Sequence, residues 1–506
     1  MRGPSASHCA AAVRIGRIVR DFMDANIEEV LIEFNPDGSL AYTHSSHGSD
    51  MGLFGGLLGW DAIDDRLMNS EKAVADAGIK TEIKIRDIGA RHPNTYKITL
   101  KNDVEYHELT AVSTGGGMIE IIEVDNVEVS IAGDYFETIL YVDDRVDDVI
   151  NYLSLNVDAD YILHHENKRH QFIEIKSQKI IELKILSKLQ SKFDIKRIKT
   201  ISPVLPVLSN KNTSIPFISC SEMLEYNSDI NLTLWELAVQ YESARGNLST
   251  EKVFGMMKEI VGIMENSIKE GIEGSDYADR ILGNQSKTFL EKMKSRQLLE
   301  GNLLNMIILY VTAIMESKSS MGIVVAAPTA GSCGGLAGSC IGAARAMGLS
   351  SDEITKAMLA AGMIGIFIAA HSTFAAEVCG CQAECGAGSG MAAAALVTLA
   401  GGTLEQTLSA ASMALQNTLG MICDPVANRV EVPCLGKNVL AATNAFACAN
   451  MALAEFDPVI LLDEVIETMD KVGKSLPAEL RCTALGGLSI TKTSREIEKK
   501  LKQNDG

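Results

Sequence analysis

Three cysteines stand in settings that could hold an iron–sulfur cluster. Cys381 lies within Cys-Gly-Cys-Gln-Ala-Glu-Cys, Cys423 opens Cys-Asp-Pro-Val, and Cys434 ends Glu-Val-Pro-Cys. Glycine and proline mark these segments as loops, where backbone amides are free to hydrogen-bond sulfur, and thiolates with such partners bind [4Fe–4S] clusters. If only three thiolates bind, the fourth iron is open to a substrate oxygen and acts as a Lewis acid.

The spacing of these cysteines leaves other interpretations open. They form no compact Cys-x-x-Cys array, and a structural zinc site would use similar residues. Thiols that only pack as small hydrophobic groups are a further alternative. The chain has 11 cysteines, and we find no N-terminal segment that joins a basic start to an apolar run. Both features indicate a reducing compartment, so we expect a cytoplasmic protein.

The charge balance argues against two classes of partner. The chain has 46 basic and 65 acidic residues, a net charge of −19, which repels nucleic acid and anionic membranes. The longest apolar stretch, residues 357–370, is too short for a membrane span, which needs roughly 20 residues. We therefore expect a buried helix there, and neither nucleic acid nor a membrane as a partner.

The first part of the chain, residues 1–134, predicts a mixed α/β domain. Its apolar periodicity is that of an initial helix followed by alternating strands. Turn signals such as Asn35-Pro36-Asp37-Gly38 separate the strands. The helix is expected over 10–23 and the strands over 29–34, 82–86, 96–100 and 119–129.

The composition changes twice after residue 134, and the whole chain predicts an α+β fold. Residues 135–200 lack glycine and follow the order strand, helix, strand, strand, helix, strand. This order predicts a small ACT-like module, with a plain structural spacer as the alternative. Residues 201–221 form a linker rich in Pro, Ser and Asn. Residues 222–506 predict a large all-α domain, with loops at 327–338, 378–390 and 423–438.

Short motifs along the chain resemble those of a known family. The N-terminal part has Gly-Pro-Ser-Ala-Ser-His at 3–8, Val-Arg-Ile-Gly at 13–16, His-Gly-Ser-Asp at 47–50, His-Pro-Asn-Thr at 92–95 and Ser-Thr-Gly-Gly-Gly at 113–117. The helical part has Ala-Pro-Thr-Ala-Gly-Ser at 327–332, Gly-Cys-Gln-Ala-Glu at 380–384, Cys-Asp-Pro-Val at 423–426 and Val-Glu-Val-Pro-Cys at 430–434. In this order they resemble the iron–sulfur L-serine dehydratases, with the β part and the α part fused in one chain.

This resemblance implies that Cys381, Cys423 and Cys434 hold a [4Fe–4S] cluster. The family's chemistry is aconitase-like: the carboxylate and β-hydroxyl of the substrate meet the open iron, and a base takes the α-proton. Loss of water then gives an enamine, which tautomerises and is hydrolysed to a 2-oxo acid and ammonia. For L-serine the product is pyruvate, so an oxygen-sensitive carbon–nitrogen lyase of amino-acid catabolism and gluconeogenesis is expected. The expected assembly is a homodimer.

The resemblance also selects three of the nine histidines, His8, His47 and His92, as catalytic candidates. Histidine suits proton abstraction near neutral pH, and His47 is our first choice as the base, with Asp50 orienting its imidazole. The alternative is a buried His47 that only orients its loop. His8 is expected to touch the substrate or to orient a loop. The N-terminal part would then cap the cluster and place the active site at a domain interface.

Small polar residues on two loops are the expected binding groups for the substrate carboxylate. They are Ser5, Ser7, Thr329, Gly331 and Ser332, whose loops also offer backbone amides to an anion. For each hydroxyl, a side chain that only caps a turn is the alternative.

Several residues depart from the family's motifs, and these departures leave the substrate open. The clear ones are Cys9, Ala11, Cys340, His371 and Cys379, while the status of Cys333, Glu377 and Cys385 is open. One interpretation is a pocket for threonine or a thiol amino acid, with Glu377 or His371 as an additional acid or base. The other is lineage drift, with small thiols packing as hydrophobic groups.

Two rival classes of function remain to be separated. A non-catalytic iron–sulfur sensor would not need the two histidine motifs at 47–50 and 92–95. A pyridoxal-phosphate deaminase would need a lysine in a phosphate-loop context, and Lys437 in Gly-Lys-Asn instead predicts a surface or loop residue. Self-blocking by a terminal thiol is not expected, because the thiol nearest the end, Cys482, lies well before it.

Overall fold

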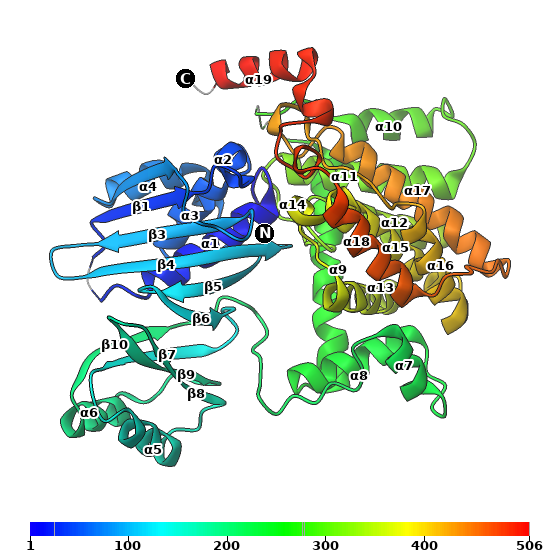
Figure 1. Cartoon of the computed structure of the whole chain (residues 1–506). Helices are drawn as coiled ribbons and strands as arrows, with labels where there is room; N and C mark the ends of the chain where they lie inside the picture. The colour runs from blue at the N-terminus through cyan, green and yellow to red at the C-terminus, as the bar shows by residue number, and fades with distance from the viewer. Residues whose placement is uncertain (25, 276, 278, 505–506) are drawn as a thin grey trace.

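The computed structural model describes residues 1–24, 26–275, 277 and 279–504, and its N-terminal part is built on a six-stranded sheet (Figure 1). The strand order is β2-β1-β3-β4-β5-β6, with β1 and β2 parallel and the other neighbours antiparallel. Helix α1 lies on β4 and β5 and packs against α3. The elements are α1 (Ala6–Arg20), β1 (Glu29–Phe34), α2 (Leu40–Thr43), α3 (Ser49–Leu57), α4 (Ser70–Asp76), β2 (Lys80–Ile85), β3 (Thr95–Lys101), β4 (Tyr106–Gly115), β5 (Met118–Val124) and β6 (Val127–Ile131).

Two strands of this sheet differ from the prediction. The segment 119–129, expected as one strand, divides into β5 and β6 because Asp125 and Asn126 turn the chain with φ values of 50° and 62°. Asp and Asn adopt this left-handed conformation more readily than most residues, which suits a two-residue hairpin turn. Strand β4 was not among the strands named from the sequence, although it runs from the outer end of the sheet toward the helical part (Figure 1).

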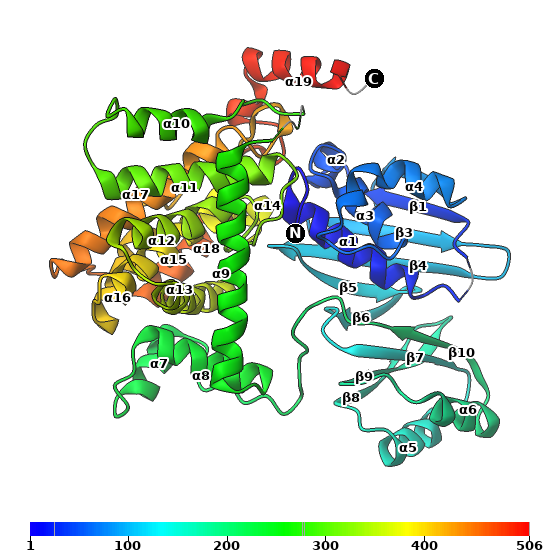
Figure 2. The ribbon, with the colours of Figure 1, turned by 180° about the vertical axis from the view of Figure 1, so that it is seen from behind.

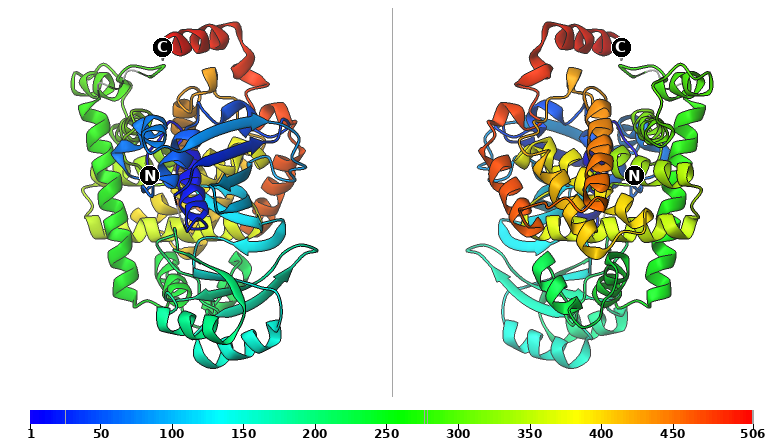
Figure 3. Two further views of the ribbon diagram at one scale, coloured as in Figure 1. Left: turned by 90° about the vertical axis from the view of Figure 1, so that its left-hand side faces the viewer. Right: turned by 90° about the vertical axis from the view of Figure 1, so that its right-hand side faces the viewer.

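The next part folds as a four-stranded antiparallel sheet with two helices on one face. The strand order is β10-β7-β9-β8, and apolar residues of α5 and α6 pack on β7 and β9 to form a separate small core. Both views in Figure 3 place this unit at one end of the molecule. Its elements are β7 (Phe136–Val142), α5 (Val146–Asn156), β8 (Tyr161–Glu166), β9 (Gln171–Ser177), α6 (Leu183–Lys192) and β10 (Ile195–Ile201).

The C-terminal part is all helical, so the predicted α+β fold is confirmed. Helix α15 lies at its centre, packed against α12, α13, α16 and α17, and α9 stands along one side (Figure 2). The helices are α7 (Cys220–Asn227), α8 (Leu234–Gly246), α9 (Thr250–Glu273), α10 (Gln285–Lys294), α11 (Asn302–Ser319), α12 (Cys333–Met347), α13 (Ser351–His371), α14 (Ala376–Cys379), α15 (Cys385–Leu399), α16 (Leu404–Gln416), α17 (Cys434–Leu453), α18 (Leu462–Ser475) and α19 (Lys492–Asn504).

The three loops predicted in this part are shorter than expected. Helices α12, α15 and α17 begin at Cys333, Cys385 and Cys434, inside the segments that glycine seemed to mark as loops. The glycines serve close helix packing instead: a Cβ at Gly338 would lie 2.5 Å from the backbone nitrogen of Val311 on α11. Because no side chain separates the two backbones there, α11 and α12 can pack tightly.

Helix α13 contains the long apolar stretch and passes a test of length and composition for a membrane span. Of its most apolar 18-residue window, 67% is buried inside the protein. Its N-terminus carries a capping box between Ser350 and Glu353, a signal typical of helices that begin in water. The helix is therefore accounted for as a core element.

Candidate active site

His8 lies at the start of α1, where it joins the N-terminal part to the helical part. Its Nδ1 lies 2.8 Å from the Ser5 hydroxyl, and its Nε2 lies 2.7 Å from the Oε1 atom of Glu377 on α14. Burial would lower the pKa of His8, but the charge and hydrogen bond of Glu377 outweigh it and raise that pKa. The Glu377 carboxylate therefore favours the imidazolium form of His8.

His47 lies beside His8 and has no hydrogen-bond partner on its ring. The two ring centroids are 4.9 Å apart, and His47 is 1% exposed. Neither Nδ1 nor Nε2 has a partner among the described residues. Burial, with the charge of His8, lowers the pKa of His47 well below its ordinary value. Because buried polar groups are nearly always paired, this neutral imidazole is the polar group at the junction most in need of a ligand.

The expected pairing of Asp50 with His47 is wrong. The Asp50 carboxylate lies 2.8 Å from Nδ1 of His44 instead. Gly48, with φ 77°, caps α3, so Asp50 falls in the first turn of that helix and faces back to His44. Gly48 also lies against Pro4, because a Cβ there would be 2.9 Å from the proline ring. The loop is thus fixed by its backbone and not by an Asp50–His47 contact.

Asn94 reaches the same carboxylate from the loop before β3, and His92 lies in the same loop within its electrostatic range. The backbone amide of Asn94 donates to Nδ1 of His92, and the Asn94 side chain hydrogen-bonds Glu377. Burial lowers the pKa of His92, and the nearby charge of Glu377 opposes this. Burial would raise the pKa of Glu377, yet His8, backbone groups and Asn94 together lower it to about 2. Glu377 is therefore a fixed anion that three N-terminal side chains face.

Strand β4 delivers the glycine loop to the same place. Gly115, with φ 106°, packs so closely on α14 that a Cβ would lie 2.8 Å from the Ala375 nitrogen. Gly116 approaches the carbonyl of Pro328 in the same way, at 3.3 Å. Only glycine allows these approaches, so the loop at 113–117 acts as a backbone contact between the two parts.

The predicted carboxylate-binding residues also meet at this junction, but each hydroxyl already has a partner. Ser7 Oγ accepts a hydrogen bond from the Ala330 amide at 2.8 Å. Thr329 donates to Glu384 at 2.6 Å and lies 3.1 Å from the Ser332 hydroxyl. Gly331 lies against Glu384, since a Cβ there would be 2.8 Å from its Oε1. These contacts agree with the alternative interpretation, in which each hydroxyl only fixes its own loop.

The three predicted ligand thiols are buried and lie within electrostatic range of one another. Cys381, Cys423 and Cys434 are 3%, 5% and 8% exposed. Burial, followed by the charges of Cys423 and Cys381, raises the pKa of Cys434 well above its ordinary value. Among the described residues, no three His, Cys, Asp or Glu side chains converge as ligands of one metal ion. The thiolates of a cluster bind separate irons and need no such convergence.

Two further cysteines adjoin the predicted ligands. Cys385 hydrogen-bonds Cys381, and Cys482 hydrogen-bonds Cys423. The segment around Cys482 is held there by its backbone, because Cys423 N donates to Leu480 O and Cys482 N donates to Cys423 O. Sequence reasoning considered Cys482 only as a terminal self-blocking thiol and set it aside because it lies well before the end of the chain, and only the fold brings it to this site.

Two lysines place positive charge beside the thiols. The Lys318 ammonium donates to the carbonyl of Val430, and burial lowers its pKa against the charges of Cys434 and Cys333. Lys437 was predicted to be a surface or loop residue, but it lies on α17, largely buried, and pairs with Asp424 at 2.7 Å. Burial would lower the pKa of Lys437, but Cys381 and Asp424 raise it. Both cations favour thiolates over thiols here.

Glu377 and Glu384 are the main functional residues that the sequence did not assign. Glu377 was named only as a departure with a possible acid–base role, shared with His371, whereas the structure places His371 exposed at the end of α13. Burial raises the pKa of Glu384, opposed by its bond from Thr329. Its position between Cys381 and Cys385 in the motif was the signal that could have identified it. Asn438, four residues after Cys434, bonds both Cys434 O and Gly331 O at 2.8 Å.

Comparison with known proteins identifies the helical part. Residues 229–489 match the family model described as "Serine dehydratase alpha chain". The "Probable L-serine dehydratase, alpha chain" of Bacillus subtilis is 35% identical over 285 residues, covering 56% of this chain and 95% of the relative. The alpha chain of the L-serine dehydratase of Peptoniphilus asaccharolyticus is 34% identical over 56% of this chain and 98% of its own length.

A longer relative shows the same match. "L-serine dehydratase 1" of Escherichia coli is 33% identical over 54% of this chain and 62% of its own length. The family match includes the loop at 327–332, Glu377, Glu384 and all three predicted ligand thiols. With this match over half of its length, the chain belongs to the serine dehydratase alpha chain family.

Proposed function

We propose that this chain is a [4Fe–4S]-dependent L-serine dehydratase that converts L-serine to pyruvate and ammonia. The observation that carries the proposal is the buried junction at which His8, His47 and Glu377 meet the loops of the family match. The names of the relatives support L-serine as the substrate. In this proposal residues 1–134 act as the β part of the enzyme, fused to the α part.

The donor set at the junction suits an iron–sulfur cluster. Cys381, Cys423 and Cys434 would hold it, since they are buried and the charge of each thiolate influences the others. Lys318 and Lys437 lie beside them. Dry thiolates near fixed cations are the surroundings in which such clusters are bound. When bound, the cluster supplies a Lewis acid that makes the substrate's β-hydroxyl a better leaving group.

His47 is the group best prepared to accept the α-proton of the substrate. Its lowered pKa keeps the ring neutral at neutral pH, and both ring nitrogens are free of protein partners among the described residues. A base of this kind must be unprotonated and within hydrogen-bond reach of the proton that it takes. Desolvation sets the first condition, and the absence of partners leaves a nitrogen open for the second.

His8 and Glu377 act as positioning residues beside this base. Because both nitrogens of His8 are engaged, by Ser5 and by Glu377, His8 has no free atom for the substrate. It instead holds a positive charge next to His47, which keeps the pKa of His47 low. Glu377 fixes His8 and also accepts from Asn94, so one carboxylate aligns the N-terminal motifs over the thiol loops.

The proposal is tested by assaying protein that has been purified without air. We expect a broad brown absorbance, pyruvate formation from L-serine, slower turnover of L-threonine, and loss of activity in air that ferrous iron and thiol reverse. The sharp yellow band of pyridoxal phosphate would contradict the proposal. So would full turnover of L-serine after a chelator has removed all iron.

A further inference from the structure

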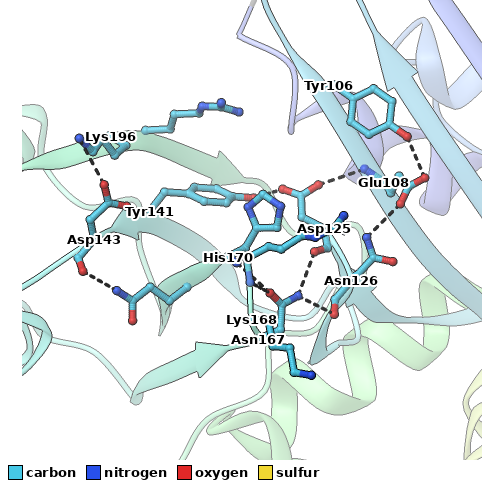
Figure 4. A pocket seen from close by; sticks show the side chains of 13 residues that line it. Tyr106, Glu108, Asp125, Asn126, Tyr141, Asp143, Asn167, Lys168, His170 and Lys196 are labelled. Carbon is cyan, nitrogen blue, oxygen red and sulfur yellow. Dashed lines mark hydrogen bonds and ion pairs between the residues drawn. The ribbon is translucent and has the colours of Figure 1, made fainter.

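A pocket lies at the seam between the two sheets, away from the thiol loops (Figure 4). Its volume is about 600 Å³, within the range of small-molecule sites. Strand β4 and the β5–β6 turn form the wall from the six-stranded sheet. The ends of β7 and β10 and the β8–β9 turn at 167–170 form the wall from the four-stranded sheet. We call this cavity the seam pocket.

The carboxylates that line the seam pocket are all engaged by protein groups. Asp125 accepts hydrogen bonds from His107, the Glu108 amide and the Tyr141 hydroxyl, at 3.0, 3.0 and 2.6 Å. Glu108 accepts from Tyr106 and Asn126, and Asp143 pairs with Lys196. The oxygens of these acids are therefore directed toward protein donors, while Asp125 and Glu108 keep their negative charge in the pocket.

Three cations in the same pocket have no such partner. Among the described residues, Lys168, Arg169 and Arg197 line the pocket, and none of their side chains makes an ion pair or hydrogen bond to another residue. His170 points toward the centre of the pocket in Figure 4, and its imidazole lies in the pocket with these three side chains. In a chain with a net charge of −19, three cations without a paired carboxylate in one pocket are an uncommon concentration of free cationic donors.

The β8–β9 turn that carries two of these cations is held in place. Asn167 Nδ2 donates to the carbonyls of Asp125 and Asn126 across the seam, and its Oδ1 accepts from the amides of Arg169 and His170. The turn is therefore docked on the opposite sheet before any ligand arrives. A fixed backbone reduces the entropy that a ligand must offset when it orders the side chains.

We propose that the seam pocket is a binding site for a small multivalent anion, either a phosphate-bearing or a polycarboxylate metabolite. Guanidinium groups of Arg169 and Arg197 suit phosphate and carboxylate oxygens because they donate in pairs. A multivalent anion can pair with more of the three free cations at once than a single carboxylate or halide can. This site lies apart from the proposed catalytic junction, and its occupancy does not depend on the reaction at that junction.

Calorimetric titration of the iron-loaded protein tests the proposal, with sodium pyrophosphate and sodium citrate as probes at matched ionic strength. We expect saturable binding of at least one probe, no saturable binding of acetate, and affinity that falls as salt is raised. The probe that binds more tightly separates the phosphate source from the carboxylate source. No saturable binding of either probe overturns the proposal.

Charge reversal assigns the binding to this pocket. The double variant K168E/R169E should weaken binding by about tenfold or more, because two attractive charges become repulsive. The matched control K184E/K188E makes the same charge change at exposed positions on α6 of the same unit and should change the affinity less than twofold. Arg197→Gln, on β10 of the same wall, should weaken binding as well. Equal affinity in K168E/R169E and in the parent protein would overturn the proposal, provided that both unfold at the same temperature.

Discussion

The six-stranded sheet meets its two neighbours through charged side chains in opposite ways. Toward the helical part, Glu377 is buried and paired with His8. Within the part of the chain that the structure describes, both ring nitrogens of His47 lack a hydrogen-bond partner. At the seam pocket, Lys168, Arg169 and Arg197 are exposed and keep their charge unpaired. This difference indicates that burial holds ionisable side chains in one protonation state, which suits a role in catalysis. Exposed cations can instead serve a ligand that comes and goes.

The largest effect is expected from a thiol at the buried junction. Cys423→Ala should abolish L-serine turnover and most of the bound iron, because one of three cluster ligands is lost. Cys340→Ala is the matched control, since Cys340 is equally buried but lies in the apolar core around α12. The control should keep its iron and its turnover, with iron content and absorbance as the readouts. A Cys423→Ala protein with full iron and full turnover would remove this residue from the ligand set.

Glu377→Gln breaks the charge pair that distinguishes the junction from the seam. We expect kcat to fall by about 10–100-fold, the usual cost when a group that orients a working side chain is lost. Without the carboxylate, the pKa of His8 falls and its charge is lost near neutral pH, so the pH profile of kcat/KM should change shape. A residue with a purely structural role would lower the amount of folded enzyme and leave that profile unchanged.

The pH dependence of stability should reveal the buried neutral ring. The pKa of His47 is lowered in the folded protein. Below pH 6.5 the unfolded chain therefore binds a proton at His47 that the folded protein does not bind. This term therefore removes stability as the pH falls, by up to about 1.4 kcal/mol per pH unit. His8 has the opposite sign, because its raised folded pKa adds stability that is lost as the pH rises through that value.

Urea unfolding at pH 7.5 and pH 5.5 measures this contribution. The loss of stability between the two values should be smaller in His47→Gln than in the parent protein. Equal losses in the two proteins would show that His47 takes up its proton in the folded state as readily as in the unfolded chain.

The smallest effect is expected from Asp50→Asn. Because Asp50 pairs with His44 and not with His47, the change should reduce kcat by less than about threefold and stability by about 1 kcal/mol or less, as for a partly exposed pair. Thermal unfolding and the pyruvate assay check both numbers. A loss in kcat as large as that of Glu377→Gln would restore Asp50 to the orienting role that the sequence suggested.

The sequence predicted those parts of the site that are carried by contiguous motifs. The histidines and the thiol loops lie within short segments whose residue types indicate their chemistry. The α+β class follows from the apolar periodicity along the chain. Asp50 was misassigned because a spacing of three residues cannot show that Gly48 starts a helix and turns Asp50 toward His44.

Features built from distant segments could not be predicted in this way. Cys482 reaches Cys423 only through the backbone contacts of residues 480–482. The seam pocket needs five elements from two sheets. In the sequence, the glycines on α12 and α15 predict loops. They instead allow close packing against other helices, and the local sequence does not show which helices those are.

Exchange of the substrate's α-hydrogen with solvent tests the central claim most directly, that the junction places a neutral His47 as the base. L-Serine is incubated in D₂O with the iron-loaded parent, with His47→Gln and with His44→Gln as the control from the same loop, and deuterium at Cα is measured by NMR. We expect exchange and turnover in the parent and the control. In His47→Gln we expect no exchange and kcat lower by about 10²–10⁴-fold, with an unchanged cluster absorbance. Exchange at the parental rate in His47→Gln would contradict the account and place the base elsewhere, with His92 the next candidate.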